Sequence, residues 1–291
     1  MKKALSILTA GCLAVSLAAC GSTAASSAAS AADSTASSAA ESTAASDTGA
    51  ADGQTYKVGI CQLVQHVALD AATQGFKDAL TEQLGDAVTF EEKNAQGDSN
   101  TCSTIINGFV SDNVDLILAN ATPALQAAQA GTNTIPVLGT SVTEYGVALG
   151  IDDFDGLVGT NISGTSNLAP LDEQAGIIKE LFPDAKTVGL LYCSAEPNSQ
   201  YQVDTVKASL EELGYTCEYY AFSDSNDLAT VCQSAADASD VIYVPTDNTV
   251  ANNTEIVNNI CQPAGVPVVA GEEGIMGGTE YRAEEQDGEE C

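Results

Sequence analysis

The residues best suited to binding chemistry in this 291-residue chain follow hydrophobic segments in two separate stretches of the sequence. In the later stretch, the acids Glu196 and Asp247 suit a cation such as an ammonium group. In the earlier stretch, Ala121-Thr122-Pro123 places a proline in a first helical turn, and the unpaired N–H groups of a helix start suit an anion such as a carboxylate. A zwitterionic amino acid would satisfy both, and exclusion of water would strengthen each interaction.

The candidate ligand-binding residues lie in loops that follow predicted strands. The set is Gln62, Thr122, Ser141, Glu196, Asn198, Ser199, Asp247 and Asn248. Three alternatives stay open. Asp247 could serve only as the N-cap of a helix, since Pro245-Thr246-Asp247-Asn248-Thr249 opens one. Glu196 could be an exposed loop acid, which is common in an acidic chain. His66 could contact the ligand or cap the first helix.

The elements that must position these residues alternate along the chain from residue 55 onward. Continuous hydrophobic segments predict strands at residues 56–63, 88–92, 114–119 and 135–139. Helical spacing of hydrophobic residues predicts a first helix that ends at Gly85. Two further helices are predicted at residues 104–111 and 123–131. Strands of this kind, alternating with helices, are typical of a parallel sheet that helices cover on both faces.

The same order of elements recurs in the second half of the chain. Predicted strands at residues 188–192, 240–244 and 265–269 correspond to those at 58–62, 115–119 and 134–138, at similar offsets. The sequence therefore predicts an α/β fold with two similar lobes, each a parallel sheet flanked by helices, at residues 55–162 and 163–274. A polar segment at residues 161–165 is the predicted hinge. Ligands of such sheets bind beyond the carboxyl ends of the strands.

Composition excludes several functional classes. Nine Lys and Arg against 40 Asp and Glu give a formal net charge of −31, which argues against binding to nucleic acid. The nine cysteines show no C-x-x-C spacing and there is one histidine, so we expect neither a metal nor a cofactor. The sequence has no nucleophile elbow and no phosphate-binding loop, so we do not expect an enzyme.

The N-terminus predicts export. Residues 1–19 combine two lysines with a short hydrophobic segment, as in a signal peptide. They lead into Leu17-Ala18-Ala19-Cys20-Gly21, which resembles a bacterial lipobox and predicts lipid modification of Cys20. The alternative is an ordinary secretory signal. Residues 20–54 are mostly Ser, Ala and Thr and predict a flexible tether. We therefore expect the protein on the extracytoplasmic face of the cell membrane, held by its lipid anchor.

Several motifs together resemble a known family. Residues 58–70 (VGICQLVQHVALD) are similar to the opening of the ABC-transporter substrate-binding proteins of the tryptophan- and tyrosine-binding type. Segments 94–98, 121–124, 164–166 and 244–249 agree with this resemblance, which covers about residues 55–275.

The resemblance implies a fold, a ligand and partners. The family has the periplasmic-binding protein type I fold, binds its ligand between the lobes and delivers it to a permease driven by an ATPase. An aromatic amino acid is the implied ligand, with Thr122 and Ser141 near its carboxylate. Asn198, Ser199 and Asp247 would surround the polar head. We expect a monomer. The alternative role is a surface sensor for a receptor kinase.

The end of the sequence departs from the family pattern. After residue 274 the family continues with further elements, whereas residues 275–291 form a polar, acidic tail. We expect this tail to be aberrant or the result of a truncation. A non-functional truncated product is accordingly a further alternative.

Overall fold

The computed structural model describes residues 54–276, which fall within one compact unit, Thr48–Cys291. The predicted signal peptide, Cys20, nearly all of the predicted tether and residues 277–291 of the predicted tail lie outside the described residues. Among the residues described, no helix combines the length and hydrophobicity needed to cross a bilayer.

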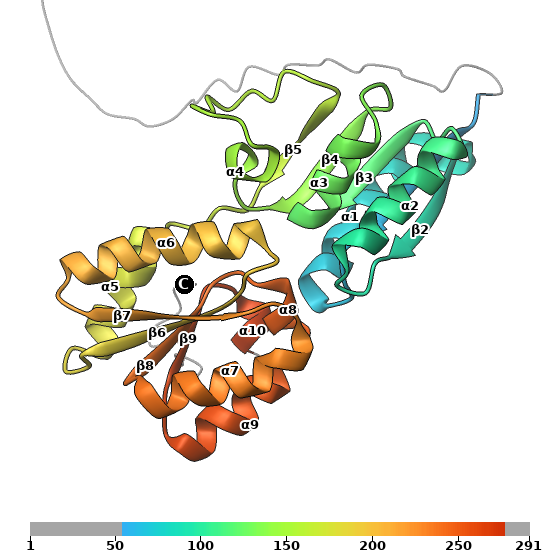
Figure 1. The fold of residues 1–291 in the computed structure, drawn as a ribbon. Coiled ribbons are helices and arrows are strands. Elements are labelled where there is room, and N and C mark those ends of the chain that lie inside the picture. The colour runs from blue at the N-terminus through green and yellow to red at the C-terminus, as the bar shows by residue number, and fades with distance from the viewer. Residues whose placement is uncertain (1–53, 277–291) are drawn as a thin grey trace, which may run out of the picture. The chain divides into compact units, whose positions relative to one another are not determined.

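Within residues 54–276, the first sheet has five parallel strands in the order β2-β1-β3-β4-β5 (Figure 1). Its strands are β1 (Tyr56–Gln62), β2 (Val88–Asn94), β3 (Leu116–Asn120), β4 (Val137–Val142) and β5 (Ile162–Ser166). The intervening helices are α1 (Val67–Leu84), the 3₁₀ turn η1 (Gly85–Ala87), α2 (Ser99–Ser111), α3 (Thr122–Gly131) and α4 (Tyr145–Leu149).

Both faces of this sheet are covered, which explains the continuous hydrophobic sequence of β1. Successive side chains of a strand point to opposite faces. Val58 and Ile60 pack with Phe76 of α1 on one face. Cys61 packs in the core on the other face, which includes Phe109 of α2. A strand buried on both sides has no place for alternating polar residues.

The second sheet repeats this arrangement with four parallel strands among the described residues, in the order β7-β6-β8-β9 (Figure 1). They are β6 (Thr187–Cys193), β7 (Thr216–Phe222), β8 (Val241–Val244) and β9 (Val268–Ala270). The helices are α5 (Leu171–Leu181), α6 (Pro197–Glu212), α7 (Ser225–Ala238), α8 (Asn248–Ala251), α9 (Thr254–Ala264) and α10 (Glu273–Met276).

The strand orders confirm the predicted α/β fold class with two parallel sheets. The order β2-β1-β3-β4 of the first sheet matches β7-β6-β8-β9 of the second, strand for strand. The cores match as well. Leu190 of β6 packs with Val206 of α6 on one face, and Leu191 packs with Leu228 of α7 on the other. The carboxyl ends of β3 and β8 are therefore equivalent positions.

The segment predicted as a hinge forms a strand, and its role as a hinge stays a prediction. Ile162–Ser166 forms β5, which pairs with β4 at the edge of the first sheet. Its residues after Ile162 are exposed, so the strand has the polar composition of a linker. A Cβ at Gly164 would clash with the carbonyl oxygen of Gly139, so close strand pairing accounts for the glycine. The predicted lobe boundary at residues 162 and 163 falls inside β5, and the lobe division itself stays a prediction.

The start of the predicted tail belongs to a helix. Ile275 and Met276 complete α10, and Ile275 is buried against the core of the second sheet. The hydrophobic core therefore includes a residue beyond position 274.

Candidate functional site

The loop between β3 and α3 has an unusual backbone. Ala121 adopts φ 87° just before α3, and Ser141 adopts φ 54° within β4. Residues other than glycine in this region cost on the order of 1–3 kcal/mol each and cluster at functional sites. The two residues are neighbours, since the N–H of Ala121 donates to the carbonyl oxygen of Thr140 (3.0 Å). Thr122 follows at the start of α3, buried, and its Oγ1 has no hydrogen-bond partner among the described residues.

The equivalent loop after β8 carries a fully buried acid. Asp247 Oδ2 accepts a hydrogen bond from the N–H of Cys193 (2.7 Å), and Oδ1 accepts from the N–H of Val250 (2.9 Å). Burial, followed by the nearby charge of Glu196, raises the pKa of Asp247 to about 7. Asp247 is therefore the predicted N-cap of α8. It also lines a cavity, so the capping and ligand-binding roles do not exclude each other.

Glu196 is buried rather than an exposed loop acid, because it holds the start of α8. Its Oε2 accepts from the N–H and the Nδ2 of Asn248 (3.1 and 2.6 Å). Its Oε1 accepts from the N–H and the Oγ1 of Thr249 (2.9 and 2.8 Å). These donors occupy both oxygens of the carboxylate, so Glu196 orders the loop that contains Asp247.

Helix α6 fixes the residue before Asp247. Gln202 Oε1 accepts from the N–H of Thr246 (3.1 Å), and Gln202 Nε2 donates to the carbonyl oxygen of Thr246 (3.2 Å). Asn198 Nδ2 donates to the same carbonyl oxygen (3.1 Å), and Ser199 Oγ lies 3.5 Å from it. Gln202 is fully buried and absent from the predicted set. Its spacing of four residues from Asn198, on the same face of α6, was the signal for it.

Several of these residues meet at a small cavity of about 40 Å³, here called the acceptor cavity. Its lining residues are His66, Ala68, Leu69, Ser141, Thr143, Asn167, Asn198, Thr246, Asp247, Asn248 and Glu272. Three buried side-chain atoms of this lining, His66 Nδ1, Asn198 Oδ1 and Glu272 Oε1, have no hydrogen-bond partner among the described residues. Buried polar groups are normally paired, so unpaired ones around a cavity make it a candidate ligand site.

Burial also affects the second acid of this cavity. Desolvation raises the pKa of the Glu272 carboxyl above its ordinary value. Asp247 and Glu272 therefore bring one fully buried and one partly buried carboxyl group to one cavity.

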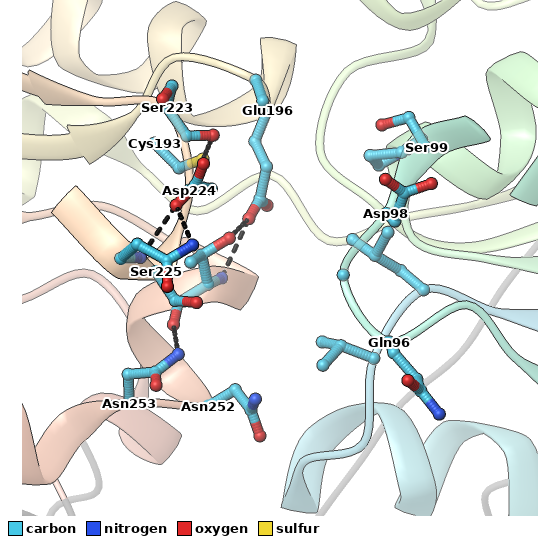
Figure 2. Close-up of a pocket in the computed structure, with 17 residues that line it drawn as sticks. Gln96, Asp98, Ser99, Cys193, Glu196, Ser223, Asp224, Ser225, Asn252 and Asn253 are labelled. Carbon is cyan, nitrogen blue, oxygen red and sulfur yellow. Dashed lines mark hydrogen bonds between the residues drawn. The ribbon is translucent and has the colours of Figure 1, made fainter. Parts of the chain in front are cut away.

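A larger cavity of about 310 Å³, here called the helix-end cavity, lies at the starts of α2 and α7. Figure 2 shows its lining side chains from the first sheet, such as Asp98, facing those from the second sheet, such as Asp224. Asp98 accepts from the N–H of Thr101 (2.6 Å), and Asp224 accepts from the N–H of Asn226 (2.8 Å). Among the described residues, no buried unpaired side-chain atom belongs to this lining. By this criterion the smaller cavity is the candidate ligand site.

The structure brings half of the predicted residues to the acceptor cavity, namely Ser141, Asn198, Asp247 and Asn248. Glu196 lines the helix-end cavity and supports Asn248, and Ser199 lies against Thr246. Thr122 and Gln62 line neither cavity.

The amide of Gln62 is occupied within the first sheet. Its Nε2 donates to Asp70 (2.7 Å) and to the carbonyl oxygen of Val64 (2.9 Å), and its Oε1 accepts from Thr73 (2.6 Å). These bonds hold the turn between β1 and α1. Thr143 and Asn167, which line the acceptor cavity, were absent from the candidate loops.

Neither metal nor disulfide chemistry is organised in the part of the chain that the structure describes. Residues 54–276 contain no group of three His, Cys, Asp or Glu side chains placed to hold a metal ion. The six cysteines of this region are buried and unbridged.

Comparison with known proteins assigns this chain to a family. Residues 57–279 match the family model described as ABC transporter substrate binding protein. The chain belongs to this family. A curated relative, the tyrosine-binding protein of Clostridioides difficile (strain R20291), is 36% identical over 222 residues, which are 75% of this chain. The chain spans 64% of the length of that relative.

Solved structures agree with the family assignment. The ABC domain from Streptococcus pneumoniae in complex with L-Trp has a TM-score of 0.73 and 31% identity, over 77% of this chain and 76% of that one. A leucine binding protein from Thermotoga maritima has a TM-score of 0.58 at 14% identity, over 78% of this chain and 67% of that one. The distant likeness supports the fold alone, which is the periplasmic-binding protein type I fold expected from the sequence.

Proposed function

We propose that this chain is the solute-binding component of an ABC importer, which captures an amino acid, preferably an aromatic one, and delivers it to a membrane permease driven by an ATPase. The family match supports the transport role. A relative named for tyrosine binding and a structure in complex with L-Trp support the ligand class. The observation that carries the proposal is the acceptor cavity, where unpaired atoms of Asn198 and Glu272 lie with the buried acid Asp247.

The acceptor cavity suits the ammonium group of an amino acid. Carboxylate and amide oxygens accept hydrogen bonds, and an ammonium group donates three. Asp247 and Glu272 supply the opposite charge, and Asn198 Oδ1 supplies a further acceptor. An ionised carboxyl buried without a cationic partner is costly, so a bound ammonium would relieve that cost.

The carboxylate of the ligand fits between the carboxyl ends of β3 and β4. Ser141 lines the acceptor cavity, and the unpaired hydroxyl of Thr122 stands at the start of the ten-residue helix α3. The first turn of a helix presents N–H groups without intrahelical partners, which bind anions. Thr122 and Ser141 would therefore hold the negative end of the same ligand whose positive end lies at Asp247.

The cavity must enlarge to admit such a ligand. A cavity of about 40 Å³ is far smaller than typical ligand pockets, which occupy roughly 300–1,000 Å³. The lining comes from loops of both sheets, so entry requires these loops to separate. An open form that admits ligand and a closed form that ligand stabilises would then exchange. Selective docking of the closed form would couple capture to transport.

The proposed location follows from the sequence alone. The lipobox-like residues 17–21 support lipid attachment at Cys20, and residues 20–54 would tether the folded region to the extracytoplasmic face of the membrane. Metabolic labelling with a radioactive fatty acid tests this, with Cys20→Ser as the control that should lose the label.

A thermal-shift screen of the twenty amino acids, nucleosides and sugars tests the proposed ligand class. Ligands that bind only the folded state raise its Tm, so tyrosine, tryptophan or phenylalanine should stabilise the protein most. Titration of tryptophan gives an independent readout, because the chain contains no Trp and the indole fluorescence comes from the ligand. Stabilisation by sugars alone would contradict the proposal.

A further inference from the structure

His66 stands at the start of α1 but does not cap it. The residue occupies the N-cap position, yet its side chain makes no capping hydrogen bond to the first turn. Its ring instead contacts helix α8, which follows strand β8 of the second sheet, since Nε2 lies 3.1 Å from Oδ1 of Asn248. The capping role that the sequence left open for His66 is therefore wrong, and the ring is available for another function.

The hydrogen-bond network assigns the protons of this ring. Asn248 Nδ2 lies 2.6 Å from Glu196 Oε2, and a carboxylate oxygen can only accept, so the amide nitrogen of Asn248 donates to it. Asn248 Oδ1 is then the acceptor that faces His66, and Nε2 must carry the hydrogen. In the neutral ring, Nδ1 consequently has a free lone pair.

That lone pair is buried at the acceptor cavity. His66 Nδ1 has no partner among the described residues, as is true of Asn198 Oδ1 and Glu272 Oε1 in the same lining. The three atoms come from separate elements: the loop before α1, the start of α6 and the loop after β9. An unpaired acceptor from the first sheet therefore accompanies two from the second.

We propose that His66 is a ligand-binding residue whose Nδ1 accepts a hydrogen bond from the ammonium group of the bound amino acid, while its Nε2–H remains on Asn248. This inference rests on the proposed function, since it assumes an amino-acid ligand. The two carboxylates supply the charge, and His66 supplies a directed acceptor from the first sheet. The His66 ring then contacts both the ligand and Asn248 of α8. Ligand binding is therefore coupled to the contact between the two halves of the fold.

Two substitutions in the full-length protein separate the two nitrogens of the ring. His66→Gln can carry a donor near the Nε2 position but offers no acceptor near Nδ1. His66→Asn can place an amide oxygen near Nδ1 but cannot reach Asn248. Calorimetric titration with L-tyrosine should show at least about tenfold weaker binding for His66→Gln, the effect typical of a lost hydrogen bond to a charged group. Gln65→Ala, at the exposed neighbour, is the matched control and should bind like the wild type.

A ligand without the amine tests the direction of the contact. 3-(4-Hydroxyphenyl)propionate matches tyrosine except for the ammonium group, so His66→Gln should not weaken its binding. Equal losses for both ligands would mean that His66 acts only through the structure and would overturn the inference. Binding of tyrosine by His66→Gln as tight as by the wild type would also overturn it. A wild-type protein that binds no amino acid would overturn the proposed function and the inference with it.

The wild-type protein offers a measurement that does not depend on a variant folding. His66 is the single histidine of the chain, so a ¹⁵N-labelled protein purified without a histidine tag gives one imidazole signal set. The free protein should show the Nε2–H tautomer, and saturating L-tyrosine should shift the Nδ1 resonance. A saturated complex in which Nδ1 does not shift would overturn the inference.

Discussion

The loop after β3, here called the first corner, and the loop after β8, here called the second corner, occupy equivalent positions in the two sheets but differ in chemistry. Thr122 begins the ten-residue helix α3 with a neutral, unpaired hydroxyl, after the left-handed Ala121. Asp247 begins the four-residue helix α8 with a buried carboxyl, both oxygens of which accept backbone hydrogen bonds. The two halves share a strand order but differ at this loop, and under the proposed function the two loops would hold opposite ends of a zwitterion.

The side chains that hold the two loops in place also differ. The loop of Asp247 is held by side chains from outside it, Glu196 and Gln202. At the other corner, Asn120 donates to the carbonyl oxygen of Leu69 (2.8 Å) and to Thr73 (2.9 Å). A buried charge needs a network of donors around it, whereas a neutral helix start needs only a fixed backbone. Each difference between the corners can be tested.

Removing the charge of the second corner should have the largest effect. We expect Asp247→Asn to weaken binding of L-tyrosine by about 2–5 kcal/mol, because the ammonium group loses its buried partner. Isothermal titration calorimetry measures the loss, and circular dichroism verifies that the variant folds. Asp224→Asn, at another helix N-cap outside the acceptor cavity, is the matched control. Unchanged affinity in Asp247→Asn would remove Asp247 from the site.

Acid should weaken binding through the same group. The pKa of Asp247 is raised to about 7, so the carboxyl takes up a proton as the pH falls below this value and loses its attraction for an ammonium group. Between about pH 8 and about pH 5.5, the affinity for L-tyrosine should fall by up to roughly 30-fold. Calorimetry across this range tests the expectation, and Asp247→Asn should show a flatter profile. An identical profile in that variant would assign the effect to other groups, such as Glu272.

The unliganded fold should respond to pH in the opposite direction. A carboxyl whose pKa is raised on folding stabilises the folded state most below its unfolded value, near 4, and this contribution is lost as the pH rises toward 7. At this one site, therefore, the protonation that favours the empty fold disfavours the complex.

Removing the support of the second corner should have a smaller effect. In Glu196→Gln, a nitrogen replaces one of the two oxygens that accept from Asn248 and Thr249, so buried donors lose their partner. We expect a loss of about 1–3 kcal/mol in the free energy of unfolding, measured by urea denaturation. Glu212→Gln, at an exposed position, should leave the stability unchanged. If both variants are equally stable, Glu196 does not hold the start of α8.

The smallest effect is expected at the first corner. Thr122→Val removes a buried hydroxyl that has no hydrogen-bond partner within residues 54–276, so the free energy of unfolding should stay the same or rise. Affinity for L-tyrosine should nevertheless fall, by about 1 kcal/mol, because the carboxylate loses a donor. This opposite response of stability and affinity distinguishes a ligand contact from a structural one. A loss of stability with unchanged affinity would contradict the assignment.

The sequence predicted the elements that are buried on both faces. β1, β3 and β8 have continuous hydrophobic residues, so their strands and the repeat of the two halves were recognisable. The edge strand β5 is mostly exposed, and its polar residues indicated a linker. Residues 104–111 lie in helix α2 as predicted, and the helix begins at Ser99, where its polar first turn is fixed by the Asp98 cap.

Residues of the candidate site could be predicted from the sequence only where they lie in loops that directly follow predicted strands. Asp247 and Asn198 were accessible to this reasoning, since both lie at helix starts beyond strands. The bonds from Glu196 to Asn248 and from Gln202 to Thr246 join residues more than forty positions apart. Such bonds depend on how helices pack on the sheet, which no local pattern reveals. The unpaired atom of His66 likewise needed the whole network to be recognised.

The grip of α6 on Thr246 has an evolutionary consequence. Gln202 and Asn198 bind only the main chain of Thr246, although this residue borders the cavity. Its side chain can therefore be exchanged without disturbing the acid that follows it. Under the proposed function, a single substitution at position 246 would therefore be a short evolutionary route to a different ligand specificity.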